Sequence, residues 1–243
     1  LPVPSDRAAI ILSIDVSGSM RSQDISPSRI EAAQAAARAF LEATPDRVRV
    51  GLVVFAGYAS TLSAPTTDHK RLVALIDGVG LARRTAIGEG LVEAVAALPG
   101  RVRPNIDGTP PMLLATPPPG VVVLLSDGRN NSGIDPIEAA RAAAAQNVTV
   151  YTIGLGSRTE TTFGWSIGGP MDEETLQTIA TMTGGEYHHA STASALHGIY
   201  RKLARAIAWD RRPTEVSALP AGAAALLLIA AAVVSAALVP LRP

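Results

Sequence analysis

Two acidic and three hydroxyl side chains are spaced so that they could hold a metal ion together. They are Asp15, Ser17, Ser19, Thr85 and Asp127. Carboxylate and hydroxyl oxygens are hard ligands, and they suit Mg²⁺ or Mn²⁺ in an octahedral shell that water completes. Because neutral hydroxyls replace some of the carboxylates, the bound ion would keep positive charge. An acidic side chain of a partner could then supply the last ligand.

The elements that must position the two acids are predicted strands. Residues 8–14 form a continuous apolar run that ends at Asp15, and residues 121–125 form a second run that ends at Ser126 and Asp127. Such runs are typical of strands buried on both faces of a parallel sheet. Ligands bind at the carboxyl ends of such strands, which meet at one edge of the sheet. We therefore expect Asp15 and Asp127 to lie at the same edge.

Strands and helices alternate along the rest of the chain. Further strands are predicted at 48–55, 60–63, 148–153 and 186–188. Helices are predicted at 28–41, 70–76, 87–98, 172–182 and 193–208, with another that Asp135 caps. Ser28 and Glu31 form a capping box at the start of the first helix. This alternation predicts an α/β fold with a Rossmann-like, doubly wound and mostly parallel sheet flanked by helices.

Composition excludes several classes of protein. The chain has 243 residues, 47% hydrophobic and 17% charged, with 21 basic and 21 acidic side chains. This length is enough for one domain of roughly 200 residues with its own core. A net charge of zero argues against a nucleic-acid-binding protein, which normally carries a basic stripe. The absence of cysteine excludes disulfides, thiolate zinc sites and a cysteine nucleophile.

The carboxyl-terminal region predicts a membrane anchor. No charged residue lies between Glu215 and Arg242, and residues 221–239 are all apolar or small. At about 1.5 Å per helical residue this run would reach roughly 28 Å, close to the hydrocarbon core of about 30 Å. Pro220 and Pro240 bracket the run, as helix boundaries often do. We expect a transmembrane helix at 220–240; the alternative is a buried, alanine-rich core helix.

The patterns of three enzyme classes are incomplete. A phosphatase of the haloacid dehalogenase type needs an acid two residues after Asp15, where Ser17 stands. A nucleophile elbow needs Gly-x-Ser-x-Gly, whereas Asp15 precedes Ser17 at that spacing. Gly154 and Gly156 lack the third glycine of a dinucleotide fingerprint, because Thr159 occupies its place. We therefore predict a protein that is not an enzyme.

The order of three motifs is more specific than any one of them. Asp-x-Ser-x-Ser alone is weak, since turns after strands often carry these residues as backbone caps. Here DVSGS is followed by TAIGEGL and then by SDG. With these motifs the chain resembles von Willebrand factor A (VWA) domains over about residues 7–208. With its hydrophobic segment, it also resembles the membrane-anchored bacterial VWA proteins of the Bat (aerotolerance) type.

The resemblance implies roles for the five residues as a metal-ion-dependent adhesion site. Ser17 and Ser19 would bind the ion through Oγ, and Thr85 would join them directly in the ligand-ready state. Asp15 and Asp127 would act directly or through water. The sixth position would then be open to a Glu or Asp of a partner. Mg²⁺ or Mn²⁺ is the expected ion.

The resemblance also implies how the chain is divided. We expect a linker at 1–6, the VWA domain at 7–209, a juxtamembrane linker at 210–219, the transmembrane helix at 220–240 and a tail at 241–243. Bat-type proteins usually carry two membrane helices before the domain, which a chain beginning at Leu1 would lack.

Those relatives place the domain outside the cytoplasmic membrane. The positive-inside rule would place it in the cytoplasm, because five basic residues precede the hydrophobic segment and only Arg242 follows it. We follow the resemblance, because several of the five belong to the last predicted helix, where the rule is weak.

Together these features predict a membrane-tethered interaction module of a bacterial envelope complex, which binds an acidic residue of a protein partner through Mg²⁺. Other VWA membrane proteins and a MoxR-type AAA+ ATPase system are further expected partners, and nucleic acid is not. The alternative is a metal-independent scaffold subunit of a membrane complex associated with that ATPase.

Overall fold

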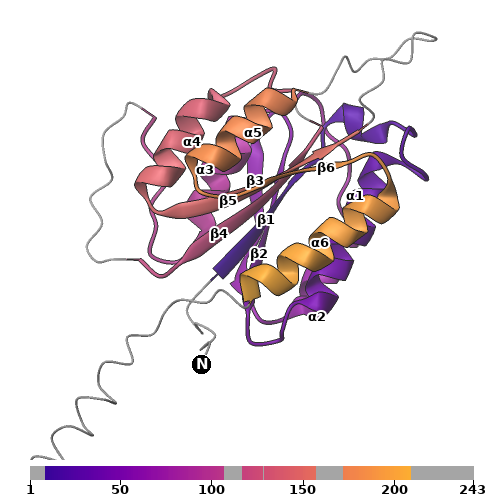
Figure 1. Cartoon of the computed structure of the whole chain (residues 1–243), viewed down its shortest axis with the longest axis horizontal. Coiled ribbons are helices and arrows are strands. Elements are labelled where there is room, and N and C mark those ends of the chain that lie inside the picture. The colour runs from indigo at the N-terminus through magenta and orange to yellow at the C-terminus, as the bar shows by residue number, and fades with distance from the viewer. Residues whose placement is uncertain (1–8, 107–116, 128, 157–171, 209–243) are drawn as a thin grey trace, which may run out of the picture. The chain divides into compact units, whose positions relative to one another are not determined.

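The apolar runs of the sequence form one six-stranded sheet in the computed structural model (Figure 1). The strands are β1 (Ala9–Asp15), β2 (Arg49–Phe55), β3 (Ala59–Thr66), β4 (Gly120–Ser126), β5 (Val148–Leu155) and β6 (Tyr187–Ala190). Their order across the sheet is β3-β2-β1-β4-β5-β6. All neighbouring strands are parallel except β3, which runs antiparallel to β2. Strand β1 lies between β2 and β4 and is buried along its whole length.

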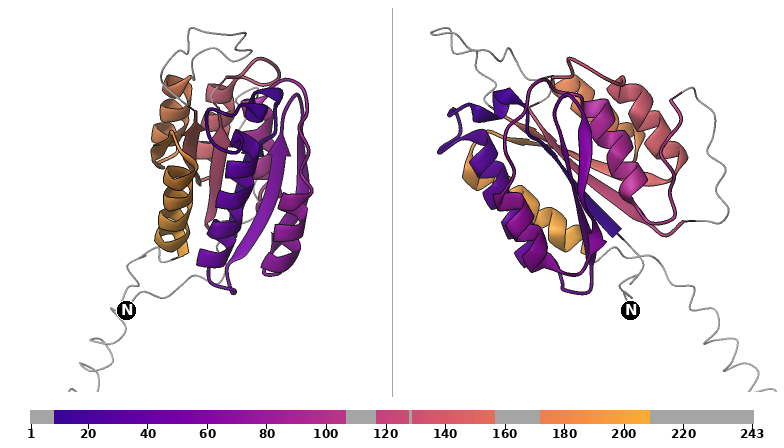
Figure 2. Two further views of the ribbon diagram at one scale, coloured as in Figure 1. Left: turned by 90° about the vertical axis from the view of Figure 1, so that its right-hand side faces the viewer. Right: turned by 180° about the vertical axis from the view of Figure 1, so that it is seen from behind.

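Helices cover both faces of this sheet, as the two views of Figure 2 show. One layer consists of α1 (Arg29–Ala43), α2 (His69–Asp77) and α6 (Ala193–Ala208). The other consists of α3 (Ile87–Ala97), α4 (Pro136–Ala145) and α5 (Glu173–Met182). A short 3₁₀ helix, η1 (Gly18–Arg21), follows β1. The predicted capping box begins α1, because Ser28 accepts a hydrogen bond from the Glu31 amide and donates one to its carboxylate.

The two helical layers enclose two hydrophobic cores. Side chains alternate along a strand, so successive residues of β1 enter different cores. Ile10 and Leu12 pack on the side of α1 and α6, where Phe40 and Tyr200 meet edge to face with centroids 5.9 Å apart. Ile11 packs on the side of α3, α4 and α5. Burial on both faces explains why β1 and β4 are continuous apolar runs rather than alternating ones.

The structure describes residues 9–106, 117–127, 129–156 and 172–208. The compact unit Ser5–Ala208 contains all of these residues, and residues 1–4 and 209–243 form a separate unit. The predicted transmembrane helix at 220–240 lies outside the described residues. Within the described ranges, no helix has the length and apolar character needed to cross a bilayer.

The predicted α/β class with a mostly parallel sheet is confirmed, and the bounds of most elements differ from the predicted ones. β3 spans Ala59–Thr66 rather than 60–63, because it pairs with β2 through register shifts that extend the hairpin beyond its central residues. β6 spans Tyr187–Ala190 rather than 186–188, because pairing with β5 carries it to Ala190. β5 spans Val148–Leu155 rather than 148–153, and it includes Gly154, which pairs with Ser126 and with His189.

Candidate metal site

Three loops meet at the carboxyl edge of the sheet and are joined by backbone hydrogen bonds. The loop after β1 donates from the Val16 amide to the carbonyl of Phe55, at 2.8 Å. The loop before α3 donates from the Ala82 amide to the Val16 carbonyl at 2.8 Å, and from the Ala86 amide to the carbonyl of Ala56 at 2.6 Å. The loops that carry Ser17, Ser19 and Thr85 are therefore held together by the backbone.

Asp15 is the last residue of β1 and is completely buried. Its Oδ1 accepts the Ser17 amide at 2.8 Å, and its Oδ2 accepts the Ser126 hydroxyl at 2.7 Å. Burial, and after it the charge of Asp127, raise the pKa of Asp15 to about 7, although the hydrogen bonds from Ser17 and Ser126 act in the opposite direction. The two acids therefore lie close enough to repel each other, as the two strand ends predict.

The two serines of the first loop present their hydroxyls together. Ser17 precedes η1 and is buried, whereas Ser19 lies within η1 and is partly exposed. Their Oγ atoms are 2.9 Å apart, within hydrogen-bonding distance. Both hydroxyls belong to the loop that directly follows Asp15, and the amide of Ser17 bonds the Asp15 carboxylate.

Thr85 is buried directly before α3 and is held by the loop that follows β4. Its amide donates to Asn131 Oδ1 at 2.9 Å, and its carbonyl accepts the Asn131 amide at 2.9 Å. Ala86, the N-cap residue of α3, has no capping side chain. Asn130 supplies that function instead, because its Oδ1 accepts the Ile87 amide at 2.8 Å.

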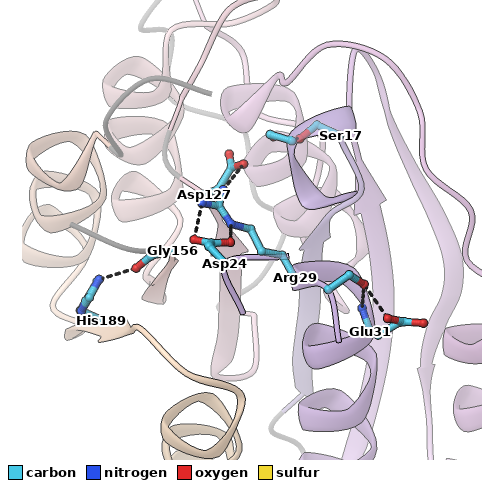
Figure 3. A network of polar contacts seen from close by, with 9 residues as sticks. Ser17, Asp24, Arg29, Glu31, Asp127, Gly156 and His189 are labelled. Atoms are coloured by element: carbon cyan, nitrogen blue, oxygen red, sulfur yellow. Dashed lines mark hydrogen bonds and ion pairs between the residues drawn. The ribbon is translucent and has the colours of Figure 1, made fainter. Parts of the chain in front are cut away.

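Asp127 follows β4 and is 7% exposed. Figure 3 shows that Arg29 reaches it from the start of α1, with Nη1 donating to Asp127 Oδ2 at 3.1 Å. The same guanidinium donates from Nε and Nη2 to the two oxygens of Asp24, each at 2.8 Å. Burial alone would lower the pKa of Arg29, but its hydrogen bonds and ion pairs with Asp24 and Asp127 raise it above the usual value.

Gly156 makes room for this guanidinium. A Cβ at Gly156 would lie 2.9 Å from Arg29 Nη2, and the residue has φ +148°, which favours glycine. The carbonyl of Gly156 also lies 2.9 Å from His189 Nε2, on the neighbouring strand β6 (Figure 3). His188, the preceding residue, has its Nε2 3.6 Å from Glu186 Oε2. The two adjacent histidines therefore engage different partners, as their alternation on a strand predicts.

The donor set fits a hard divalent cation. Within the described part of the chain, no group of three or more His or acidic side chains is placed to hold a metal ion. An ion at this edge would therefore depend on two carboxylates together with the serine and threonine hydroxyls. Burial is the main cause of the raised pKa of Asp15 and the charge of Asp127 is the second, so a cation would relieve the repulsion between the two acids.

The sequence reasoning did not identify every residue that supports this edge. Ser126 directly precedes Asp127 in the sequence, but no sequence pattern predicts that its hydroxyl bonds Asp15, which is distant in the chain. Asn130 and Asn131 follow Asp127 on one loop, and that proximity was the available signal. Arg29 gave no signal, because its pairing with Asp127 joins residues 98 positions apart.

Comparison with known proteins identifies relatives over most of the chain. Residues 10–130 match the von Willebrand factor type A domain. A UPF0353 protein from Nocardia farcinica is 34% identical over 250 aligned positions, which cover 96% of this chain and 72% of that protein. The BatB protein from Bacteroides thetaiotaomicron has a similar structure, with TM-score 0.64 and 25% identity, over 82% of this chain and 98% of that one.

A more distant structure bears on the metal. Proximal thread matrix protein 1 from the mussel byssus, solved with a zinc-occupied metal-ion-dependent adhesion site, has TM-score 0.60 and 20% identity. The similarity covers 83% of this chain and 46% of that protein. At this identity the likeness shows a shared fold, and the zinc belongs to the mussel protein.

Proposed function

We propose a function that starts from the family of this chain, since the chain belongs to the UPF0353 family and contains a VWA domain. VWA domains generally mediate protein binding, and some carry a metal site. The proposal is that this protein is a membrane-tethered, non-enzymatic interaction module, which binds an acidic residue of a partner through Mg²⁺ or Mn²⁺. Asp15, Ser17, Ser19, Thr85 and Asp127 would hold the ion.

One observation carries the proposal. Asp15 is a fully buried carboxylate beside a second acid, and its direct partners are the hydroxyl of Ser126 and the amide of Ser17 rather than a cation. A buried carboxylate without a counter-charge is costly unless a proton or a cation neutralises it. The hydroxyls of Ser17 and Ser19, whose Oγ atoms are 2.9 Å apart, are neutral oxygens that could complete the ligands of such a cation.

Some residues of the chain would bind the ion, and others would hold these ligands in position. A bound ion supplies a positively charged position that a carboxylate of a partner can occupy. Ser126 and the Ser17 amide orient the Asp15 carboxylate through both of its oxygens. Asn131 fixes the backbone of Thr85 on both sides of that residue. Such supporting contacts restrict where the ligand oxygens lie before an ion arrives.

The cellular setting is also part of the proposal. The uncharged run at 221–239 supports a membrane tether at 220–240. On the resemblance to Bat-type proteins, the proposal also places the domain outside the cytoplasmic membrane in a bacterial envelope complex, in which other VWA membrane proteins and a MoxR-type ATPase system take part. A metal-independent scaffold is the second candidate. The contact of Arg29 with Asp127 favours it, because a guanidinium that Asp127 shares with Asp24 already supplies positive charge next to one of the two acids.

The test uses the whole chain, solubilised in mild detergent, as bait for membrane extracts of the source bacterium. Partners are compared in Mg²⁺ and in EDTA, for the wild type and for Thr85→Val. Thr61→Val is the matched control, since Thr61 lies in β3 and bonds Glu93 rather than the candidate site. A partner retained in Mg²⁺ and lost in EDTA and with Thr85→Val supports the proposal. A partner held equally well in EDTA supports the scaffold. Calorimetric titration with Mg²⁺ and Mn²⁺ reports separately on the ion.

A further inference from the structure

Exposed arginines lie on two of the loop segments beside the candidate metal site, and these segments contain no acid, whereas Asp24 and Asp135 are exposed further along the adjoining loops. We define the arginine rim as Arg21, at the end of η1, with Arg83 and Arg84, which precede Thr85; all three are exposed. No acidic residue occurs at 16–21, 56–58 or 78–88. Some arginines elsewhere in the domain pair with acids, as Arg38 does with Asp77 and Arg103 with Glu89 and Glu93. Within the described part of the chain, the three rim arginines make no such pair.

The rim is held in place next to the site. The Gly57 amide donates to the Arg83 carbonyl at 2.9 Å. A Cβ at Gly57 would lie 3.3 Å from Arg84 Cβ and 3.6 Å from its Cδ, so the glycine makes room for the stem of Arg84. Arg84 itself has φ 66°, a left-handed conformation that is uncommon for residues other than glycine. Strained residues of this kind gather at functional sites.

An exposed aromatic side chain lies in the same group of loops. Tyr58 follows Gly57 in the turn between β2 and β3, and it is 71% exposed, the most of any large apolar side chain that the structure describes. Aromatic residues make up only 4% of the chain. Exposed tyrosine and arginine are the residue types enriched at the centres of protein interfaces.

We infer that the partner of this site is an acidic segment of another protein, with several carboxylates rather than one. This inference rests on the proposed function. One carboxylate of the segment ligates the metal, its neighbours pair with Arg83 and Arg84, and Tyr58 packs against the segment beside them. The charges are complementary, because the rim is positive and the bound ion adds positive charge at its centre.

A protein segment fits these observations better than a nucleic acid does. Proteins that follow a phosphate backbone carry a basic stripe across a face, whereas this chain has no net charge. The rim is confined to the loops at one edge of the sheet. A metal ion held by the proposed ligands would leave a position open to a carboxylate of a protein, and Tyr58 offers an exposed aromatic ring to a peptide side chain. RNA therefore becomes an outcome to be tested.

The probe is a displayed library of nine-residue peptides with a fixed central Asp and random flanking positions. It is selected on the whole chain in mild detergent with Mg²⁺ and eluted with EDTA. The wild type should enrich Asp and Glu at the flanking positions. The double variant Arg83→Gln/Arg84→Gln should still enrich metal-dependent peptides, but without that acidic preference. Its affinity for the peptides selected on the wild type should fall about three- to tenfold at low salt, and the difference should shrink at high salt.

The matched control is Arg47→Gln/Arg71→Gln. Both residues are exposed, and both lie toward the opposite edge, where His69 Nε2 is 2.9 Å from the Val48 carbonyl at the start of β2. This variant should select the same acidic peptides as the wild type. Tyr58→Ser should weaken the selected peptides without changing their acidic preference.

The outcomes separate the two levels of the argument. If the selected peptides need Mg²⁺ but show no acidic residues beside the central Asp, the inference is overturned and the proposed function stands. The same holds if the preference for acidic flanking residues persists in the Arg83→Gln/Arg84→Gln variant. Selected peptides that remain bound in EDTA overturn the proposed function as well. If no peptide is enriched, the inference fails, and Mg²⁺ titration decides the metal site independently. Binding of a labelled single-stranded RNA that this double variant abolishes would assign the rim to nucleic acid and overturn the inference.

Discussion

Arg29 Nη1 lies 3.1 Å from Asp127 Oδ2, so a guanidinium from the start of α1 contacts the second acid of the candidate metal site. The first acid, Asp15, has hydroxyl and amide partners instead. The two carboxylates therefore have different counterparts in the protein itself. Asp127 shares the guanidinium of Arg29 with Asp24, whereas no charged side chain contacts Asp15 among the described residues. This difference leads to separate predictions for stability and for metal binding.

Arg29→Gln should destabilise the metal-free domain and strengthen its metal binding. The substitution removes three donated hydrogen bonds to two carboxylates. The expected cost is about 1–3 kcal/mol in the free energy of unfolding. Loss of a positive charge beside Asp127 should raise the affinity for Mg²⁺, on the order of tenfold at low salt. Thermal unfolding in EDTA and calorimetric titration measure the two effects.

The control for this prediction is Arg38→Gln on the same helix. Arg38 pairs with Asp77 at a surface where both side chains are over a third exposed, 36% and 51%. Exposed pairs of this kind contribute little, so stability and Mg²⁺ affinity should both stay close to the wild type. Weaker Mg²⁺ binding in Arg29→Gln would contradict the prediction, because Arg29 would then support the ion rather than compete with it.

The pH dependence of stability should reveal the protonation of Asp15. Burial, followed by the charge of Asp127, raises the pKa of Asp15 to about 7. Between about pH 4 and 7 the folded protein then keeps a proton that the unfolded chain releases. Stability in EDTA should therefore fall as pH rises through this window, by at most about 1.4 kcal/mol per pH unit, and level off above it. Saturating Mg²⁺ should stabilise the domain most at the upper end, because the ion requires the carboxylate.

Asp15→Asn isolates this contribution. The neutral amide cannot titrate, so the fall in melting temperature between about pH 5 and 8 in EDTA should become shallower than in the wild type. The variant should also lose its stabilisation by Mg²⁺. Asp68→Asn serves as the control, since Asp68 caps the exposed start of α2 and asparagine caps helices equally well. An unchanged slope in Asp15→Asn would contradict the assigned role.

Gly88→Ala should disturb the candidate metal site by displacing the backbone next to it. A Cβ at Gly88 would lie 2.2 Å from the Ile134 carbonyl oxygen, so α3 or the loop after β4 must move. That loop holds Thr85 through Asn131. We expect a loss of about 1–3 kcal/mol in stability, together with weaker Mg²⁺ binding, measured by denaturant unfolding and calorimetry.

Gly198→Ala is the matched control, because it makes the same substitution in a helix at a position where the new Cβ meets no other atom. Nothing lies within 4 Å of a Cβ at Gly198, which is exposed on α6. Alanine should stabilise this helix by up to about 1 kcal/mol and leave Mg²⁺ binding unchanged. Equal effects of the two substitutions would show that packing of Gly88 against Ile134 does not matter.

Asn131→Ala should weaken metal binding without removing a proposed ligand. Asn131 Oδ1 accepts the Thr85 amide, and its loss leaves that amide without its partner. Loss of such supporting contacts typically costs metal affinity about tenfold or more. Mg²⁺ titration checks this, with Asn147→Gly as the control, because Asn147 has φ 53° at the end of α4, a conformation that glycine adopts freely. Wild-type affinity in Asn131→Ala would exclude a role for this contact in positioning Thr85.

The sequence by itself determined the class of fold and the two acids of the candidate site. Runs that are apolar at every position, such as those that end at Asp15 and Asp127, indicate strands buried on both faces, and parallel strands bring their carboxyl ends to one edge. These are local patterns with a fixed period, so they can be recognised in a single chain. The capping box at Ser28 and Glu31 is local in the same way.

Only the tertiary structure decided what surrounds those acids. Ser126 meets Asp15 across 111 positions of sequence, and Arg29 meets Asp127 across 98. Asn130 and Asn131 cap α3 and hold Thr85 from a loop more than forty residues away. None of these contacts produces a periodic pattern or a fixed spacing in the sequence, because each depends on which strands become neighbours and on the register at which they pair. The protonation of Asp15 and the exposure of the arginine rim are set by burial and by distances between loops, and these exist only once the chain has folded.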